Sequence, residues 1–335
     1  MKKFLAILTL AALVMAFSVA SAELTAPVNL SFAAQEVGTA AYNYAAALQA
    51  VMIEGLPEGS TINITTDSPG GVGAAILIDG GDADLIMSNS APAKWSMEEG
   101  VLGNDPTPDV MALAGGMGHD FINVMFTQKF VNDTGITTVE ELVEKQYPVK
   151  IVIKMPGTLG ELAAEKVFEA AGVTFDDIRS WGGVVEMTGG DAIKSGLQDD
   201  LYDMTIDHIG AGQANTTELC LTHDMYDVQM GDELMAKLVE MGFDYITVDA
   251  NTWNGQTEEI RTVGSQQCIL VPTDMDEEVA YALTKAVAEG KESLAATVAA
   301  MSYFDPSVAG SLALTGVPLH PGAARYYTEM GYAAE

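Results

Sequence analysis

Short apolar runs alternate with longer amphipathic segments in the first part of the chain. Residues 28–33 and 61–66 are rich in β-branched and apolar side chains, which predicts two strands. Between them, residues 42–54 place alanine, leucine, valine and methionine at helical spacing. A third strand is expected at 84–88, after a Pro-Gly-Gly turn and a short helix. This alternation over short connections predicts an α/β fold with a mainly parallel, doubly wound sheet.

A second unit of the same kind begins near residue 149. Residues 149–154 and 203–207 have the pattern of strands, and residues 159–171 between them have the pattern of a helix. Two further extended stretches, 121–128 and 266–272, lie at the borders of this unit, and we interpret them as a pair of hinge strands. The chain is therefore expected to cross from one lobe to a second lobe and to return.

The first residues have the composition of a secretory signal peptide. Lys2 and Lys3 precede an apolar run over 4–17, and Ala20-Ser21-Ala22 fits a small-residue cleavage site. The run is short for a membrane span of about 20 residues. We therefore expect cleavage before Glu23 and export to the periplasm. The expected division of the chain is a signal peptide over 1–22, the first part of lobe one over 23–124, lobe two over 125–266, and the hinge return with the completion of lobe one over 267–335.

The charge balance limits the partners of the protein. The chain has 15 Lys and Arg against 47 Asp and Glu, a formal net charge of −32 at pH 7. Nucleic acid and anionic membrane surfaces are not expected partners, because phosphate binding needs clustered basic residues. A small anionic ligand would have to be held by local dipoles and hydrogen bonds.

Motifs for metal, cofactor or catalytic chemistry are absent from the sequence. Cys220 and Cys268 are its two cysteines, and either one disulfide or two buried thiols would fit them. There is no GxxxxGK[ST], and no GxGxxG opens a helix after the first strand. The four histidines are scattered, outside any GxSxG or HExxH context. We therefore expect no metal, no cofactor and no enzymatic activity.

Glycines and hydroxyl-bearing residues follow the predicted strands. In open α/β sheets, ligands bind outside the carboxyl ends of the strands. Glycine allows the backbone to approach a ligand, and amides at a helix start can bind a carboxylate. The same residue types also cap helices and fill turns without any ligand. The candidate ligand-binding residues at these strand ends are Thr39, Gly70, Gly71, Ser88, Asn89, Ser90, Gly157 and Thr158.

Charged and aromatic side chains near the same strand ends are further candidates. Lys154 ends a strand in a chain with few basic residues, so it can pair with a ligand carboxylate or lie along the strand edge. Asp207 and His208 follow a second-lobe strand, where ligand contact and internal hydrogen bonding both fit. Tyr42 and Trp181 can stack on a ligand or belong to the core.

Several segments resemble, in chain order, motifs of the TAXI family of solute-binding proteins, which serve TRAP (tripartite ATP-independent periplasmic) transporters. The C-terminal segment is the most specific of these. The segments are GTAAYNYAAAL at 38–48, GDADLIMSNS at 81–90, KIVIKMPGTLGE at 150–161, FDDI at 175–178 and VPLHPGAARYY at 317–327.

The resemblance implies a type II-like, two-lobed periplasmic binding protein that closes around a small carboxylate. Typical ligands of the family are glutamate-like amino acids and dicarboxylates, and its partners are TRAP membrane subunits driven by an ion gradient. Such proteins are usually monomers. By position, the resemblance assigns ligand contacts to Thr39 and Tyr42, the Gly70-Gly71 turn, Ser88 to Ser90, and Gly157-Thr158.

Two departures from the family pattern bear on the ligand. Leu159 and Gly160 occupy the last two positions of the family's Gly-Ser-Gly-Thr loop, which removes a hydroxyl. Asp207 near the cleft would disfavour a ligand with two negative charges. In the C-terminal motif, Pro321-Gly322 is expected to open a helix, and Arg325 to pair with an acid of its own lobe.

Two other functions are compatible with the same fold. A periplasmic sensor would present its ligand to a membrane receptor kinase instead of a permease, and the sequence does not separate these roles. A periplasmic enzyme would need a nucleophile or a metal cluster in the cleft, and the sequence contains neither.

Overall fold

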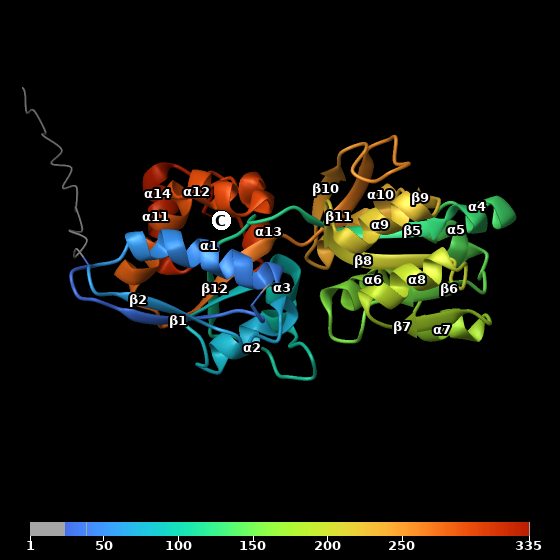
Figure 1. Cartoon of the computed structure of the whole chain (residues 1–335). Coiled ribbons are helices and arrows are strands. Elements are labelled where there is room, and N and C mark those ends of the chain that lie inside the picture. The colour runs from blue at the N-terminus through green and yellow to red at the C-terminus, as the bar shows by residue number, and fades with distance from the viewer. Residues whose placement is uncertain (1–23, 38, 335) are drawn as a thin grey trace, which may run out of the picture.

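The structure is a computed structural model that describes residues 24–37 and 39–334. Its strands form two five-stranded sheets and a separate two-stranded hairpin. The sheets lie in two lobes side by side, and the first lobe contains both the N-terminal and the C-terminal segments (Figure 1). The expected signal peptide over 1–22 lies outside the described residues.

The first sheet has the strand order β2-β1-β3-β12-β4. Strands β1, β2 and β3 pair in parallel, whereas β12 is antiparallel to both β3 and β4. The strands expected at 28–33, 61–66 and 84–88 are confirmed to within one residue. The strands of this sheet are β1 (Asn29–Ala33), β2 (Thr61–Thr65), β3 (Leu85–Asn89), β4 (Val110–Ala114) and β12 (Gln267–Pro272).

Helices cover both faces of the first sheet, because buried side chains alternate along its strands. Leu85 and Ile86, neighbours in β3, belong to separate hydrophobic clusters on opposite faces. One face is covered by α1 (Ala40–Glu54), α11 (Glu277–Glu289), α12 (Lys291–Thr297) and α14 (Pro321–Met330), and the other by α2 (Ala74–Asp79) and α3 (Ser90–Glu98). The shorter elements of this lobe are the 3-10 helices η1 (Gly71–Gly73) and η2 (Ala299–Tyr303) and the helix α13 (Leu312–Thr315).

The second sheet has the order β7-β6-β8-β5-β9, with β5 antiparallel to its neighbours β8 and β9. Its strands are β5 (Asp120–Thr127), β6 (Lys150–Ile153), β7 (Val184–Met187), β8 (Met204–Gly210) and β9 (Met225–Asp227), and the hairpin is β10 (Asp244–Val248) with β11 (Ile260–Gly264). Each lobe thus has one strand that runs against the others, which fits the expected two-lobed binding-protein fold.

Side-chain alternation also separates the two faces of the second sheet. Ile206 of β8 lies in the large core of this lobe, whereas its neighbours Thr205 and Asp207 point to the other face. The core face is covered by α4 (Gln128–Thr134), α5 (Val139–Glu144), α6 (Leu159–Ala170), α7 (Phe175–Ser180) and α10 (Asp232–Glu240). The other face is covered by α8 (Gly190–Gln198), α9 (Ala214–Thr222) and the hairpin.

The predicted hinge strands are regular members of the two sheets. The stretch expected at 121–128 belongs almost entirely to β5 of the second sheet, and the stretch at 266–272 to β12 of the first. The chain crosses between the sheets in the shorter segments 115–119 and 265–266. A lobe boundary after residue 124 would divide β5. An extended apolar run has the same appearance in a hinge as in a central strand, which explains this difference.

The lobes contact each other through an aromatic side chain of the first lobe. Trp95 of α3 donates its indole N–H to the Met241 carbonyl of the second lobe at 2.6 Å. Its ring meets Phe243 edge to face, with centroids 5.6 Å apart. Val72 and Val101 of the first lobe join the same hydrophobic cluster as the second-lobe core. Trp95 therefore belongs to the packing between the lobes.

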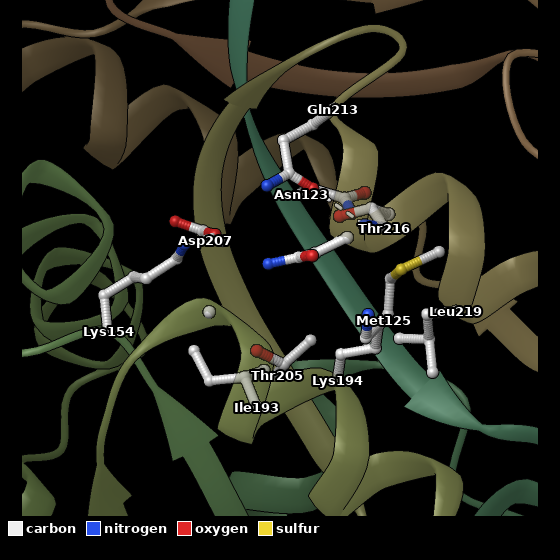
Figure 2. A pocket seen from close by; sticks show the side chains of 12 residues that line it. Asn123, Met125, Lys154, Ile193, Lys194, Thr205, Asp207, Gln213, Thr216 and Leu219 are labelled. Carbon is white, nitrogen blue, oxygen red and sulfur yellow. Dashed lines mark hydrogen bonds and ion pairs between the residues drawn. The ribbon is translucent and has the colours of Figure 1, made fainter. Parts of the chain in front are cut away.

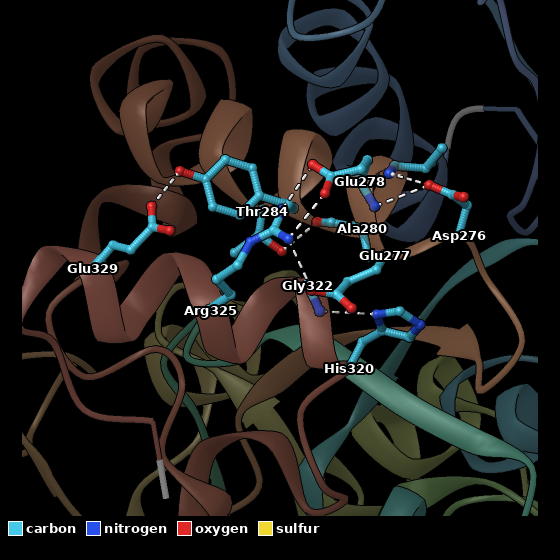
Figure 3. A network of polar contacts seen from close by, with 11 residues as sticks. Asp276, Glu277, Glu278, Ala280, Thr284, His320, Gly322, Arg325 and Glu329 are labelled. Atoms are coloured by element: carbon cyan, nitrogen blue, oxygen red, sulfur yellow. Dashed lines mark hydrogen bonds and ion pairs between the residues drawn. The ribbon is translucent and has the colours of Figure 1, made fainter. Parts of the chain in front are cut away.

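The C-terminal motif stabilises the first lobe, as expected. Pro321 is the first residue of α14, and His320 caps it by accepting the Gly322 N–H on Nδ1 at 3.3 Å. Arg325 donates to Glu278 from both terminal nitrogens, Nη1 and Nη2, and Nη1 also reaches Glu277 at 2.8 Å (Figure 3). A bidentate guanidinium–carboxylate pair fixes geometry more tightly than a single contact does. The motif thus docks α14 on α11.

The contact between α14 and α11 predicts the effect of a methyl group. A Cβ on Gly322 would lie 2.2 Å from the Glu277 carbonyl oxygen, which is backbone and cannot move aside. Gly322→Ala should therefore lower the free energy of unfolding by about 1–3 kcal/mol in urea denaturation. Gly189→Ala is the matched control, because its added Cβ has no non-neighbouring atom within 4 Å. Equal stability of the two variants would contradict this packing.

Candidate functional site

A pocket lies in the second lobe, between the sheet and the helices α8 and α9 (Figure 2). It lies at the carboxyl end of β6 and beside the half of β8 that is nearer the first lobe. Gly210, at the end of β8, pairs with Asp120, which directly follows the crossing segment 115–119. The pocket is lined by Asn123, Met125, Lys154, Gly190, Ile193, Lys194, Thr205, Asp207, Gln213, Asn215, Thr216 and Leu219. This is the edge of an α/β sheet at which ligands bind.

The register of β5 on β8 divides the pocket into two layers. Asn123 pairs with Asp207, and Met125 pairs with Thr205, so these side chains share one face of the sheet at two successive levels. The level of Asn123 and Asp207 lies nearer the first lobe, because β8 runs from Met204 toward Gly210. We call the level of Asn123 and Asp207 the upper layer and that of Met125 and Thr205 the lower layer.

The upper layer contains an ion pair. Lys154 Nζ lies 3.2 Å from Asp207 Oδ2, and both side chains are largely buried. Burial raises the pKa of Asp207, while Lys154 and the His208 N–H act in the opposite direction. In Figure 2, Lys154 and Asp207 face each other on one side of the pocket, with Met125 and Leu219 on the other. The Lys154 ammonium can therefore reach a ligand only beside a carboxylate of the protein.

The first turns of two helices also reach the upper layer. Gly189 caps α8 without a side-chain hydrogen bond, and a Cβ on Gly190 would lie 3.1 Å from Lys154 Nζ. Gln213 caps α9 by accepting the Thr216 N–H at 2.7 Å. The free amides and the dipole at a helix start favour an anion. Together with Lys154 they make the upper layer suited to one carboxylate, although the protein as a whole is strongly acidic.

The structure gives a reason for Gly160, one of the two residues that depart from the loop of the TAXI family. A Cβ at this position would lie 2.2 Å from Asp207 Oδ1 and 2.8 Å from Lys154 Cγ. The glycine therefore leaves the space that the Lys154–Asp207 pair occupies.

The first-lobe candidates form a separate group. Ser88 Oγ donates to the Gly71 carbonyl at 2.8 Å, and a Cβ on Gly71 would lie 2.8 Å from Asn89 Oδ1. The turn at Gly70, where φ is +95°, therefore meets the end of β3. Thr39 caps α1 by accepting the Tyr42 N–H, and Tyr42 packs against the first-lobe core. None of these side chains lines the pocket.

Ser265, in the second crossing segment, joins candidates from both lobes. Its N–H donates to His208 Nε2 at 3.0 Å, and its carbonyl accepts from Asn89 Nδ2 at 2.9 Å. Its hydroxyl accepts the Ala91 N–H at 2.8 Å and lies 3.3 Å from Ser90 Oγ. Asn89, Ser90 and His208 thus bind the connection between the lobes.

Gly157 and Thr158 lie in the turn before α6. The Thr158 hydroxyl donates to the Met155 carbonyl at 2.7 Å and accepts the Glu161 N–H at 3.3 Å, so it caps the helix. A Cβ on Gly157 would lie 3.4 Å from Leu102 of the first lobe. Of the twelve candidate site residues, all of which the structure describes, Lys154 and Asp207 are the two that line the pocket.

Other sequence expectations are resolved by the structure. Cys220 and Cys268 are free and buried, one in α9 of the second lobe and the other in β12 of the first. Trp181 is the C-cap of α7 and packs against the second-lobe core. Within residues 24–37 and 39–334, no group of three or more His, Cys, Asp or Glu side chains could hold a metal ion.

Sequence reasoning missed most of the pocket. Gly190 follows β7, and Gln213, Asn215 and Thr216 follow β8, so the same strand-end rule would have selected them. Asn123 carried no such signal, because it lies inside a strand that was interpreted as a hinge.

The fold is that of a two-lobed periplasmic binding protein. A TctC solute-binding protein from Polaromonas has a TM-score of 0.51 at 15% identity, over 82% of this chain and 87% of that one. MatC from Rhodopseudomonas palustris, solved with bound malate, also has a TM-score of 0.51, at 12% identity over 90% of this chain and 99% of that one.

Residues 32–331 match the NMT1-like family, and the chain belongs to that family. A search of curated proteins finds no match. In the part of the chain that the structure describes, no helix combines the length and the apolar character needed to cross a membrane.

The cap at α6 predicts what Thr158→Ala will do. Both hydrogen-bonding functions of the hydroxyl are occupied within the turn, so its loss should destabilise the protein by about 1 kcal/mol. The affinity for a ligand, measured by calorimetry, should stay within about twofold, because the hydroxyl bonds only within its own turn and does not line the pocket. A large loss of affinity at unchanged stability would show that the hydroxyl contacts the ligand.

His208 predicts a pH-dependent term in stability. Burial lowers its pKa to about 4 in the folded protein, whereas the nearby Asp120 raises it. An unfolded histidine, with a pKa of about 6.5, takes up its proton first as the pH falls. His208 should therefore stabilise the fold above about pH 6.5 and lose this contribution as the pH falls to about 4.

His208→Gln isolates this contribution, because glutamine can accept the Ser265 N–H but does not titrate. Lowering the pH from 7 to 4 should reduce the unfolding free energy of the wild type by up to about 3 kcal/mol more than that of the variant. A difference that is independent of pH in urea melts would contradict the buried, neutral imidazole.

Proposed function

We propose that this protein is an extracytoplasmic solute-binding receptor of the periplasm. It captures a small carboxylate, of the general class that includes glutamate-like amino acids and dicarboxylates, and delivers it to the membrane subunits of a TRAP transporter. The observation that carries this proposal is the upper layer of the second-lobe pocket, where Lys154 and the first turns of α8 and α9 converge.

Electrostatics supports capture by short-range contacts. The net charge of −32 repels anions at a distance, so a carboxylate must gain its binding energy inside the pocket. An ammonium group and helix-start amides supply charge-assisted hydrogen bonds there, each worth about 1.5–3 kcal/mol. The two-lobed fold with two crossing segments supports closure, in which the first lobe would add contacts to a ligand already held in the second-lobe pocket and so shift the equilibrium toward the closed form.

The proposed TRAP partner is supported by the ordered motifs that resemble the TAXI family. The proposed carboxylate ligand is supported by MatC, a protein of similar fold that was solved with bound malate. Uptake by proteoliposomes that contain the cognate TRAP membrane subunits should require this protein and an ion gradient. Uptake that ATP hydrolysis drives instead would contradict the partner.

A ligand screen with one variant tests the function. Amino acids and mono-, di- and tricarboxylates are added to the processed protein while its melting temperature is recorded. At least one carboxylate should stabilise it, by about 2.7 kcal/mol at a hundredfold excess over Kd. Lys154→Gln should weaken calorimetric binding of that ligand by about tenfold or more, since a charge-assisted hydrogen bond is lost.

Lys285→Gln is the matched control. Its ammonium group lies 3.9 Å from Glu289 on the surface of the first lobe, away from the pocket, so its removal should leave the affinity unchanged. If no carboxylate binds, or if the two lysine variants bind equally well, the proposed function is wrong.

A further inference from the structure

A buried hydroxyl in the lower layer of the pocket has no partner. Thr205 is 7% exposed, and its Oγ1 makes no hydrogen bond within the residues that the structure describes. A buried polar atom of this kind destabilises a protein, so native structures almost always pair it. Thr205 also lines the pocket, so its unpartnered hydroxyl lies beside the space that a ligand would enter.

The surroundings of Thr205 are apolar. Met125 pairs with it across the sheet, and Ile193 and Leu219 lie one helical turn beyond the starts of α8 and α9. Ile193 and Leu219 also belong to a small hydrophobic cluster with Val152 and Leu197. The lower layer is therefore suited to an apolar chain with room for one hydrogen bond at Thr205.

A second carboxylate in this layer would meet a cation that is more tightly paired than Lys154. Lys194 lines the pocket, but its ammonium lies 2.6 Å from Glu218 Oε2, closer than Lys154 Nζ lies to Asp207 Oδ2 at 3.2 Å, so a second carboxylate would have to compete with the tighter ion pair. Asp207, one level above, would repel a second negative charge. A buried charge without a partner binds poorly, whereas an uncharged chain loses nothing on entering an apolar layer.

We infer that the pocket selects small monocarboxylates with an uncharged far end, apolar or bearing one hydrogen-bonding group, over dicarboxylates of the same length. This inference rests on the proposed function and narrows its ligand class. The carboxylate binds in the upper layer at Lys154 and the helix starts, the chain lies against Met125 and Leu219, and any polar atom at the far end meets the Thr205 hydroxyl.

Calorimetric titration with ligands of equal length tests this selection. Pentanoate is compared with glutarate, and norvaline with glutamate, so that the second pair shows whether an amino group beside Asp207 is needed. In at least one pair the uncharged-end ligand should bind at least tenfold more tightly than its partner. Tighter or equal binding of glutarate and glutamate would overturn the inference but leave the proposed function intact. If neither these four ligands nor any other carboxylate binds, both the inference and the proposed function are wrong.

A variant tests the hydroxyl independently. Thr205→Val keeps the shape but removes the unpartnered group, so the melting temperature of the ligand-free protein should stay the same or rise. The ratio of the affinity for 5-hydroxypentanoate to the affinity for pentanoate should fall fivefold or more relative to wild type. Thr284→Val is the matched control, since its buried hydroxyl donates to the Ala280 carbonyl at 2.8 Å and its loss should lower the melting temperature. A fall of similar size for Thr205→Val would show that Thr205 has a partner in the folded protein, and would overturn the inference.

Discussion

The antiparallel pairing of β5 with β8 is the constraint on which the pocket depends. It runs from Asp120 opposite Gly210 to Phe126 opposite Met204, and it sets Asn123 level with Asp207 and Met125 level with Thr205. A shift of β5 by one residue along β8 would turn Asn123 and Met125 into the core and bring Val124 to the pocket face. Because β5 directly follows the crossing segment 115–119, the same pairing also fixes where the second lobe meets the first.

The candidate residues at the strand ends divide into those that bind the connection between the lobes and those that line a cavity. Asn89, Ser90 and His208 all bind Ser265, so they hold the second crossing segment against both lobes. Lys154 and Asp207 instead form the charged side of the pocket. Polar strand ends in this protein therefore fall into two groups: one binds the connection between the lobes, and the other lines the pocket in which we propose that a solute binds.

The sequence predicted the layered fold well, because periodicity determines which strands and helices form. Strands β1, β2 and β3 and helices α1 and α6 follow directly from it. It did not separate a hinge from a central strand at β5 and β12, since both are extended and apolar. It identified Lys154 and Asp207 but not Asn123, whose pairing partner lies more than eighty residues away along the chain and is known only from the register. It did not detect Thr205, because an unpartnered hydroxyl is a property of packing and not of residue type.

The most direct test of the central claim is a crystal structure with the carboxylate that stabilises the protein best. We expect one ligand carboxylate oxygen within hydrogen-bonding distance of Lys154 Nζ or of the first amides of α8 or α9, and the ligand chain against Met125. A ligand held entirely by first-lobe residues such as Gly70, Gly71 and Ser88, with no group in the second-lobe pocket, would contradict it.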